Sequence, residues 1–484
     1  MIALANPIEF SSLRVEPCQG KAAGVTMNNH RTYLSDQIAY VRRRGILLGG
    51  IALLVCVLLT SAISIGQSSV APACTDSSRI AHIATLTTSL PPFATRRDSP
   101  TLLAFMYSRY EQTRETVLGY ECSGVPLIAL DGQKWRPTAK ADDFGIDYFV
   151  AEIVRFTHVD LNRAIEIFFV LLLTISFGSG IVGVFFWIEG TVSRIAAIIG
   201  VTCLALATAV VGDIYMVQSG IVVAVVPWAL YFARLSNPGT GVVLFAFLAG
   251  FGSALANVIR FHAGTAILLF LAALLLLACR APLWHRALVA ALAIAGFIMP
   301  VVYFQVLVNR RDATLEKLDA TYKPIVPHHQ FWHTVYIGFG FLDNEYGLKF
   351  QDEIADAKAR SIEPGVDYVS RDYERILRAE VFRFIKAHPR FVFETFAAKT
   401  GMLFIMLLVC ANLGLPSALL YPKPWSVEAA FWLALAFTAT QGLLAVPSPD
   451  YLLGYMAFAV FYGILGIDFA LVHGVVPSRE RARG

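Results

Sequence analysis

Apolar runs long enough to cross a bilayer recur along this chain, and no other feature restricts its fold as strongly. A transmembrane helix needs about 20 predominantly apolar residues. Of the 484 residues, 56% are hydrophobic and only 15% are charged, whereas a soluble domain has about 25% charged residues. The sequence therefore predicts an all-α polytopic membrane protein with about ten spans. The predicted spans are residues 45–66, 164–187, 192–212, 218–234, 239–259, 263–279, 286–306, 395–415, 427–446 and 451–472.

Basic residues give these spans an orientation. The triplet Arg42 to Arg44 precedes the first span, and later basic residues fall in alternate loops. Because Lys and Arg concentrate in short cytoplasmic loops, we expect those loops and both tails, residues 1–44 and 473–484, to be cytoplasmic. The first apolar run follows a long polar segment, so we interpret it as a retained helix and not as a cleaved signal peptide. The loop residues behind this orientation are Arg194, Arg234, Arg280, Arg286 and Lys423.

Two large segments then lie on the outer face. The first covers residues 67–163, ahead of spans two to seven (164–306), and the second covers residues 307–394, ahead of spans eight to ten (395–472). They contain most of the acidic, aromatic and His residues that lie outside the spans. The formal net charge of +4 is too small to indicate a nucleic acid partner.

The first outer segment contains two of the seven cysteines, Cys74 and Cys122. The others lie in spans, at span ends or in the N-terminal tail. A cysteine pair in an oxidising compartment favours a disulfide, and two unpaired thiols are the alternative. No Cys and His spacing indicates a structural zinc site.

Later in the same segment, the adjacent carboxylates Asp142 and Asp143 stand before the run FGIDYFVAEIVRFT. Apolar residues at helical spacing in this run predict an amphipathic helix that lies in the membrane interface. One carboxylate at its start would cap the helix and the other would interact with its dipole. A carboxylate there also suits a general base or a metal ligand, and the two readings do not exclude each other.

Polar and aromatic residues are densest in the second outer segment. This composition favours sugar recognition, because aromatic faces stack on sugar rings while amide, carboxylate and imidazole groups hydrogen-bond to hydroxyls. A small packed outer domain and a metal site made by three His side chains are the alternatives. The candidate sugar or acceptor ligands are His328, His329, Trp332, His333, Tyr336, Asn344, Glu345 and Tyr346.

A second amphipathic helix is predicted to begin after Ser370, a typical N-cap residue, and to lead into the eighth span. Lys399 lies within that span. A charge at this depth is a candidate functional group, and snorkelling to the headgroups is the alternative.

Arg260 and His262 lie in an outer turn between two spans that have almost no other charge. An Arg on this side needs an anionic partner. Lipid phosphate, a protein carboxylate and a substrate phosphate are the candidates, and we favour the phosphate of a lipid substrate.

Together these features resemble the GT-C superfamily of polytopic glycosyltransferases, which includes protein O-mannosyltransferases and lipid A aminoarabinose transferases. The resemblance covers about residues 45–472 and rests on the acidic pair, the short-looped spans and the Arg260 turn. The stretches FWHTVYIGFG (331–340) and PSPDYLLGY (447–455) are similar to bacterial membrane proteins of polysaccharide loci. One departure is that residues 67–141 separate the first span from the acidic pair, which in many members follows that span closely.

The resemblance implies a catalytic carboxylate at Asp142 or Asp143, with Asp143 preferred. This base would take the acceptor's proton while a polyprenyl phosphate leaves the sugar with inversion. Arg260, His262 and Lys399 would bind the donor phosphate. If a divalent cation such as Mg²⁺ or Mn²⁺ assists, the acidic pair would hold it.

The expected protein is therefore an enzyme of the bacterial inner membrane with a periplasmic active site. Its donor would be a polyprenyl-phosphate-linked sugar from the membrane lipid, and its acceptor an envelope glycan, lipid or protein. The alternative is a non-enzymatic carrier or scaffold of a polysaccharide assembly system. A carrier needs ionisable residues along a path through the bilayer, and the spans offer few, such as Glu166 and Asp468.

Overall fold

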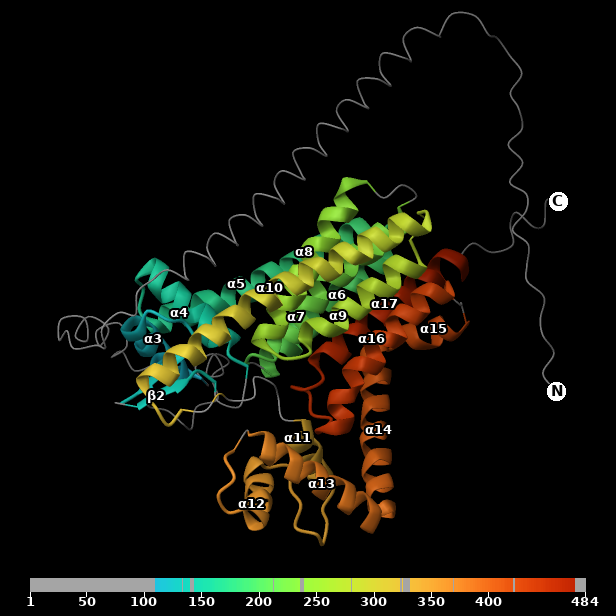
Figure 1. Cartoon of the computed structure of the whole chain (residues 1–484). Coiled ribbons are helices and arrows are strands. Elements are labelled where there is room, and N and C mark those ends of the chain that lie inside the picture. Colours follow the sequence, from blue (N-terminus) through green and yellow to red (C-terminus); the bar gives the residue numbers. More distant parts are fainter. Residues whose placement is uncertain are drawn as a thin grey trace, which may run out of the picture. The chain divides into compact units, whose positions relative to one another are not determined.

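The computed structural model describes residues 109–474, except 133, 140–142, 212, 236–238, 280, 323, 325–330, 369 and 421–422 (Figure 1). The predicted N-terminal tail and first span lie outside this part of the chain. So do four candidate residues: Cys74, Asp142, His328 and His329.

Eight described helices are long and apolar enough to cross a membrane. Each corresponds to a predicted span, so the multi-pass helical architecture is confirmed at this level. A further predicted span forms α9 (Ala263–Leu277), which is apolar but has only 15 residues. The eight helices are α5 (Leu161–Trp187), α6 (Thr191–Val211), α7 (Met216–Arg234), α8 (Thr240–Ile259), α10 (Leu283–Leu318), α14 (Pro389–Ala411), α16 (Trp425–Leu444) and α17 (Leu453–Gly474). The predicted span 395–415 ends at Ala411, and the short α15 (Gly414–Leu420) follows it.

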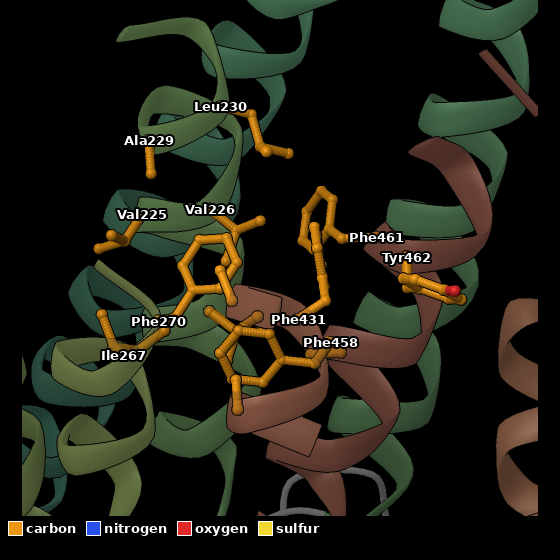
Figure 2. Packing of buried hydrophobic residues seen from close by; sticks show 14 of the residues in the cluster. Val225, Val226, Ala229, Leu230, Ile267, Phe270, Phe431, Phe458, Phe461 and Tyr462 are labelled. Atoms are coloured by element: carbon orange, nitrogen blue, oxygen red, sulfur yellow. The ribbon is translucent and has the colours of Figure 1, made fainter. Parts of the chain in front are cut away.

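Aromatic side chains fill the centre of the bundle, where α7, α9, α16 and α17 meet (Figure 2). The ring of Phe270 lies 5.0 Å from that of Phe431 and 5.5 Å from that of Phe458, measured between centroids. Between helices in lipid, close packing of this kind replaces the hydrophobic effect as the source of association. On the outside of the bundle, Ile175 is 64% exposed and Val210 is 77% exposed, as expected for side chains that contact lipid.

The segment before α5 folds as α3 (Tyr110–Ser123), the hairpin of β1 (Ile128–Asp131) and β2 (Lys134–Pro137), and α4 (Gly145–Thr157). The fully buried Asp147 of α4 accepts hydrogen bonds from Thr113 of α3 at 2.6 Å and from Gln112 at 2.8 Å. The predicted amphipathic helix therefore forms. Its apolar face, however, packs against α3, α5 and α8, so it is buried in protein and not in the membrane interface.

Helix α10 has 36 residues and a length of about 54 Å, which exceeds the roughly 30 Å hydrocarbon layer of a bilayer. Its first part packs on α8 and α9, and its last part reaches the β-hairpin and α4 (Figure 1). One continuous helix thus supports both the bundle and the segment that precedes α5.

The segment between α10 and α14 contains α11 (Phe331–Gly338), the 3-10 turn η2 (Phe339–Phe341), α12 (Asp352–Ile362) and α13 (Arg371–Ala387). The predicted N-cap is confirmed, since the Ser370 side chain accepts the N–H of Tyr373 at 3.1 Å. The apolar face of α13, including the fully buried Tyr373 and Leu377, packs against α11 and α12. This face forms the core of a small helical domain and does not lie on a membrane surface.

Candidate functional site

Three turns of the bundle and the start of α4 meet at one end, which we call the Asp143 end. The turns join α6 to α7, α8 to α9, and α16 to α17. Asp143 lies two residues before Gly145, the first residue of α4, and Gly145 touches the last turn of α8. Of the predicted acidic pair, the structure describes Asp143, whereas Asp142 lies outside the described residues.

Asp143 and Arg260 form an ion pair across 117 positions of sequence. Oδ2 of Asp143 lies 3.3 Å from Nη1 of Arg260 and accepts the backbone N–H of Phe261 at 3.0 Å. The Asp143 side chain is 11% exposed and the Arg260 side chain 8%. The two charges are therefore largely removed from water, where their interaction is stronger than at an open surface. Among the partners considered for Arg260, the structure shows a protein carboxylate.

Gly145 makes this pairing possible. A Cβ atom at this position would lie 2.4 Å from the carbonyl oxygen of Val258 and 2.6 Å from the nitrogen of Ile259. Only glycine lets α4 begin this close to the last turn of α8. Since Asp143 lies two residues before Gly145 and Arg260 directly follows Ile259, the backbone contact brings the two charged side chains together.

Two tyrosine rings hold the guanidinium group in place. The Cζ atom of Arg260 lies 4.4 Å from the ring centre of Tyr215 and 5.7 Å from that of Tyr451. The two rings contact each other edge to face at 5.3 Å. Stacking of this kind suits the planar guanidinium and restricts its rotation. The sequence analysis assigned neither tyrosine to the site, because they come from two other turns, although Tyr451 lies in the PSPDYLLGY stretch.

The turn that carries Arg260 is braced from within the α8–α9 hairpin. The side-chain oxygen of Asn257 accepts the N–H groups of Gly264 at 2.6 Å and Thr265 at 3.0 Å. A Cβ on Gly264 would lie 1.7 Å from the carbonyl oxygen of Ser253, so the two backbones touch here. The turn is consequently a rigid platform for the Arg260 side chain and the Phe261 N–H.

His262 is the N-cap residue of α9 and has a positive φ of 70°. Its ring lies 3.8 Å from that of Phe261 and 5.6 Å from that of Phe437. Helix N-termini carry partial positive charge and favour anions. The guanidinium, the Phe261 N–H and the start of α9 therefore form an environment that favours negative charge, which the Asp143 carboxylate occupies.

A second charge pair lies at the same end. Nε of Arg109 is 3.8 Å from Oδ1 of Asp213, in the turn that also carries Tyr215. Asp213 has a positive φ of 58°, and its carboxylate accepts the N–H of Ile214 at 2.7 Å. This pair connects the start of α3 to the α6–α7 turn, beside the tyrosines that contact Arg260.

Those predicted sugar-binding residues that the structure describes do not converge on Arg260. One contact between their segment and the tyrosines beside Arg260 is an edge-to-face one, with 6.0 Å between the rings of Phe350 and Tyr451. His333 is buried: its Nδ1 lies 2.7 Å from the Tyr373 hydroxyl, and its Nε2 lies 3.0 Å from Oδ1 of Asp352. Tyr336 is also buried, and burial raises the pKa of its hydroxyl to about 12.

Trp332 packs between Phe331 and Phe382, with ring separations of 4.9 and 5.4 Å. The Asn344 amide is committed to its own turn, since it binds backbone groups of Leu342, Tyr346 and Leu348. Glu345 and Tyr346 are exposed, and the Tyr346 ring lies 4.2 Å from that of His388. These side chains mostly build the small helical domain, the alternative that the sequence left open.

Lys399 is 2% exposed, and its ammonium group donates to the carbonyl oxygens of Leu443 at 3.0 Å and Ala445 at 2.6 Å. These carbonyls lie at the end of α16, where the last turn lacks intrahelical donors. The Lys399 ammonium neither snorkels to the surface nor contacts Arg260 within the described residues. Its visible role is to stabilise the end of α16.

A half-buried carboxylate on α4, Glu152, was not predicted. Its Oε1 accepts the hydroxyl of Tyr120 at 3.0 Å, and the neighbouring Tyr148 hydroxyl lies 3.0 Å from that of Tyr303 on α10. Arg155 donates to Tyr120. Burial raises the pKa of the Glu152 carboxyl above its ordinary value, although Tyr120 and Arg155 act in the opposite direction. The signal in the sequence was the spacing of Tyr148 and Glu152 on one helical face.

No group of three or more His, Cys, Asp or Glu side chains suited to a metal ion occurs among the described residues. Cys122 is disulfide-bonded, and its predicted partner Cys74 lies outside the described residues. No protein-family model, curated protein or solved structure matches the chain, so the case for a function rests on the geometry of the Asp143 end.

Proposed function

We propose that this protein is a membrane glycosyltransferase that moves a sugar from a polyprenyl-phosphate donor to an envelope glycan, lipid or protein. The observation that supports this proposal is the Asp143–Arg260 pair. It places a carboxylate, which can accept a proton, beside a guanidinium, which can bind a phosphate. The basic loops at the opposite ends of the helices support a periplasmic position for this site in a bacterial inner membrane.

In the proposed reaction, Asp143 takes the proton of the acceptor hydroxyl as its oxygen attacks the anomeric carbon of the donor. The bond between that carbon and the phosphate oxygen breaks, and its electron pair leaves with the polyprenyl phosphate. Attack opposite to the leaving group inverts the anomeric configuration. Arg260 and the Phe261 N–H stabilise the negative charge that grows on the departing phosphate.

Among the residues that the structure describes, polar side chains gather at the Asp143 end and not along a path through the bundle, which favours a transferase over a carrier. The centre of the bundle is filled by aromatic and aliphatic side chains (Figure 2). Arg234 and Asp468 pair at 3.0 Å near the opposite end, where α7 finishes. This second pair also supplies a matched control for experiments on Asp143 and Arg260.

The test is sugar transfer by purified protein in proteoliposomes that contain labelled polyprenyl-phosphate sugars and an extract of envelope acceptors. Asp143→Asn should lower the transfer rate at least about 100-fold, because it removes the general base. Asp468→Asn, which breaks the control pair, should retain transfer. Full transfer by a folded Asp143→Asn protein would remove Asp143 from catalysis, and Asp142→Asn then tests its neighbour. Absence of transfer with every donor in the wild-type protein would favour the carrier or scaffold.

A further inference from the structure

In the Asp143–Arg260 contact, the proposed general base is itself bound to the proposed phosphate-binding group. One carboxylate oxygen, Oδ2 of Asp143, accepts hydrogen bonds from both Nη1 of Arg260 and the N–H of Phe261. A phosphate oxygen bound at this site would use the same two donors. In the ligand-free protein the carboxylate therefore stands where the anion of a ligand belongs.

The two donors are held by their neighbours, and their acceptor stands on a short side chain. The Arg260 guanidinium lies against the rings of Tyr215 and Tyr451, and Asn257 braces the turn that contains the Phe261 N–H. The Asp143 carboxylate stands on a side chain with only two rotatable bonds, just before the first turn of α4. Rotation about these bonds would carry the carboxylate away from both donors.

Electrostatics make simultaneous occupancy unfavourable. Both side chains are about nine-tenths buried, so like charges repel strongly here. A phosphate that binds Arg260 beside an unmoved Asp143 carboxylate would place two anions on one cation. The start of α9 favours an anion but supplies less than one unit of positive charge.

We propose that a lipid phosphate and the Asp143 carboxylate compete for Arg260 and the Phe261 N–H, so that phosphate binding releases Asp143. This inference rests on the phosphate recognition proposed above and adds an order of events. The carboxylate is held by Arg260 until the donor arrives, and it becomes available as a base only when the donor is bound. A protein without donor therefore keeps its general base neutralised.

The test measures binding of farnesyl phosphate, a short polyprenyl phosphate, to the full-length protein in detergent. Asp143→Asn removes the competing charge and should tighten the dissociation constant at least tenfold. Arg260→Gln should abolish binding, and Asp468→Asn should leave it unchanged. Inorganic phosphate, measured in parallel, should show the same rank order more weakly if the headgroup is what the site recognises. An Asp143→Asn protein with unchanged or weaker affinity overturns the exchange.

A second measurement uses the unaltered protein and remains decisive if Asp143→Asn does not fold. Carboxyl groups are labelled with an amine and a carbodiimide in large excess over the farnesyl phosphate, and the Asp143 peptide is quantified by mass spectrometry. Saturating probe should increase labelling of Asp143 several-fold and leave Asp468 unchanged. Equal or lower labelling of Asp143 with bound probe contradicts its release.

These readouts separate the exchange from the proposed reaction, because neither requires sugar transfer. Tighter binding by Asp143→Asn in a protein that transfers no sugar would keep the exchange and reject the transferase. Transfer activity together with unchanged affinity in Asp143→Asn would keep the transferase and reject the exchange.

Discussion

The geometry of the site depends on Gly145, because this residue has no side chain. Its missing Cβ lets the start of α4 touch the end of α8 and so sets the distance between Asp143 and Arg260. The resemblance placed the carboxylate and the arginine in one site, but no local sequence pattern predicted that they form a direct ion pair. Their meeting depends on a backbone contact between segments more than a hundred positions apart, which no local pattern reports.

Gly145→Ala should destabilise the protein by about 1–3 kcal/mol, the usual cost of forcing an extra methyl group into a packed contact. It should also reduce sugar transfer and weaken farnesyl phosphate binding, because α4 must move away from Arg260. Thermal unfolding and the binding assay above measure both effects. Gly178→Ala is the matched control, since no atom lies within 4 Å of the Cβ it would add. Equal behaviour of the two variants would contradict the role of the close contact.

Lys399 shows how a charge in a span can be structural. Lys399→Met keeps the length of the side chain but leaves the carbonyl oxygens of Leu443 and Ala445 without their donor. We expect a loss of about 1–3 kcal/mol, seen as a lower melting temperature, with farnesyl phosphate binding retained. The exposed Lys386 gives the control, Lys386→Met, which should change neither quantity. A Lys399→Met protein of normal stability that no longer binds the probe would return Lys399 to the phosphate site predicted from the sequence.

At the scale of elements, the positions of the two amphipathic helices were predicted correctly, but the surfaces that cover their apolar faces were not. Both α4 and α13 have the expected apolar faces, and Ser370 caps α13 as expected. Their apolar faces are buried by other helices of the same chain. The 3.6-residue period reports that a face is buried, but it is the same whether lipid or protein covers that face.

Helix α4 also predicts a dependence of stability on pH. Because burial raises the pKa of Glu152 above 4.5, the folded protein retains this proton at pH values where the unfolded chain has released it. The contribution of Glu152 to stability should therefore fall as pH rises above that value. Glu152→Gln, which does not titrate, should melt near the parent temperature at pH 4 and above it at neutral pH. A melting difference that does not vary with pH would contradict the raised pKa.

At the scale of the whole molecule, the apolar runs predicted all eight described helices that are long enough to cross a membrane. Each apolar run long enough to span the bilayer predicts one helix, because a span in lipid must satisfy its own backbone hydrogen bonds. The length of α10 was underestimated, since its second half is polar and continues as a helix on the support of the β-hairpin and α4. For the site, sequence supplied the charged residues but not the tyrosines that orient them.

The orientation of the bundle can be measured with two cysteine substitutions. Lys349→Cys lies in the segment after α10, and Glu189→Cys lies in the turn between α5 and α6, and both positions are exposed. A membrane-impermeant maleimide should label Lys349→Cys in intact cells and Glu189→Cys only after the membrane is opened. The parent protein shows the background from its native cysteines. The reverse pattern would place the Asp143 end in the cytoplasm and exclude the proposed periplasmic reaction.

Helix α10 also has the dimensions of a lever. Its backbone touches that of α8 at Gly296, and about 33 Å of helix extends from there to Leu318. A rotation of about 10° at this fulcrum would displace the far tip by about 6 Å. The tip contacts the β-hairpin, and Tyr303 along the way contacts Tyr148 of α4. A small tilt within the bilayer would therefore be magnified into a displacement of the segment that holds Asp143.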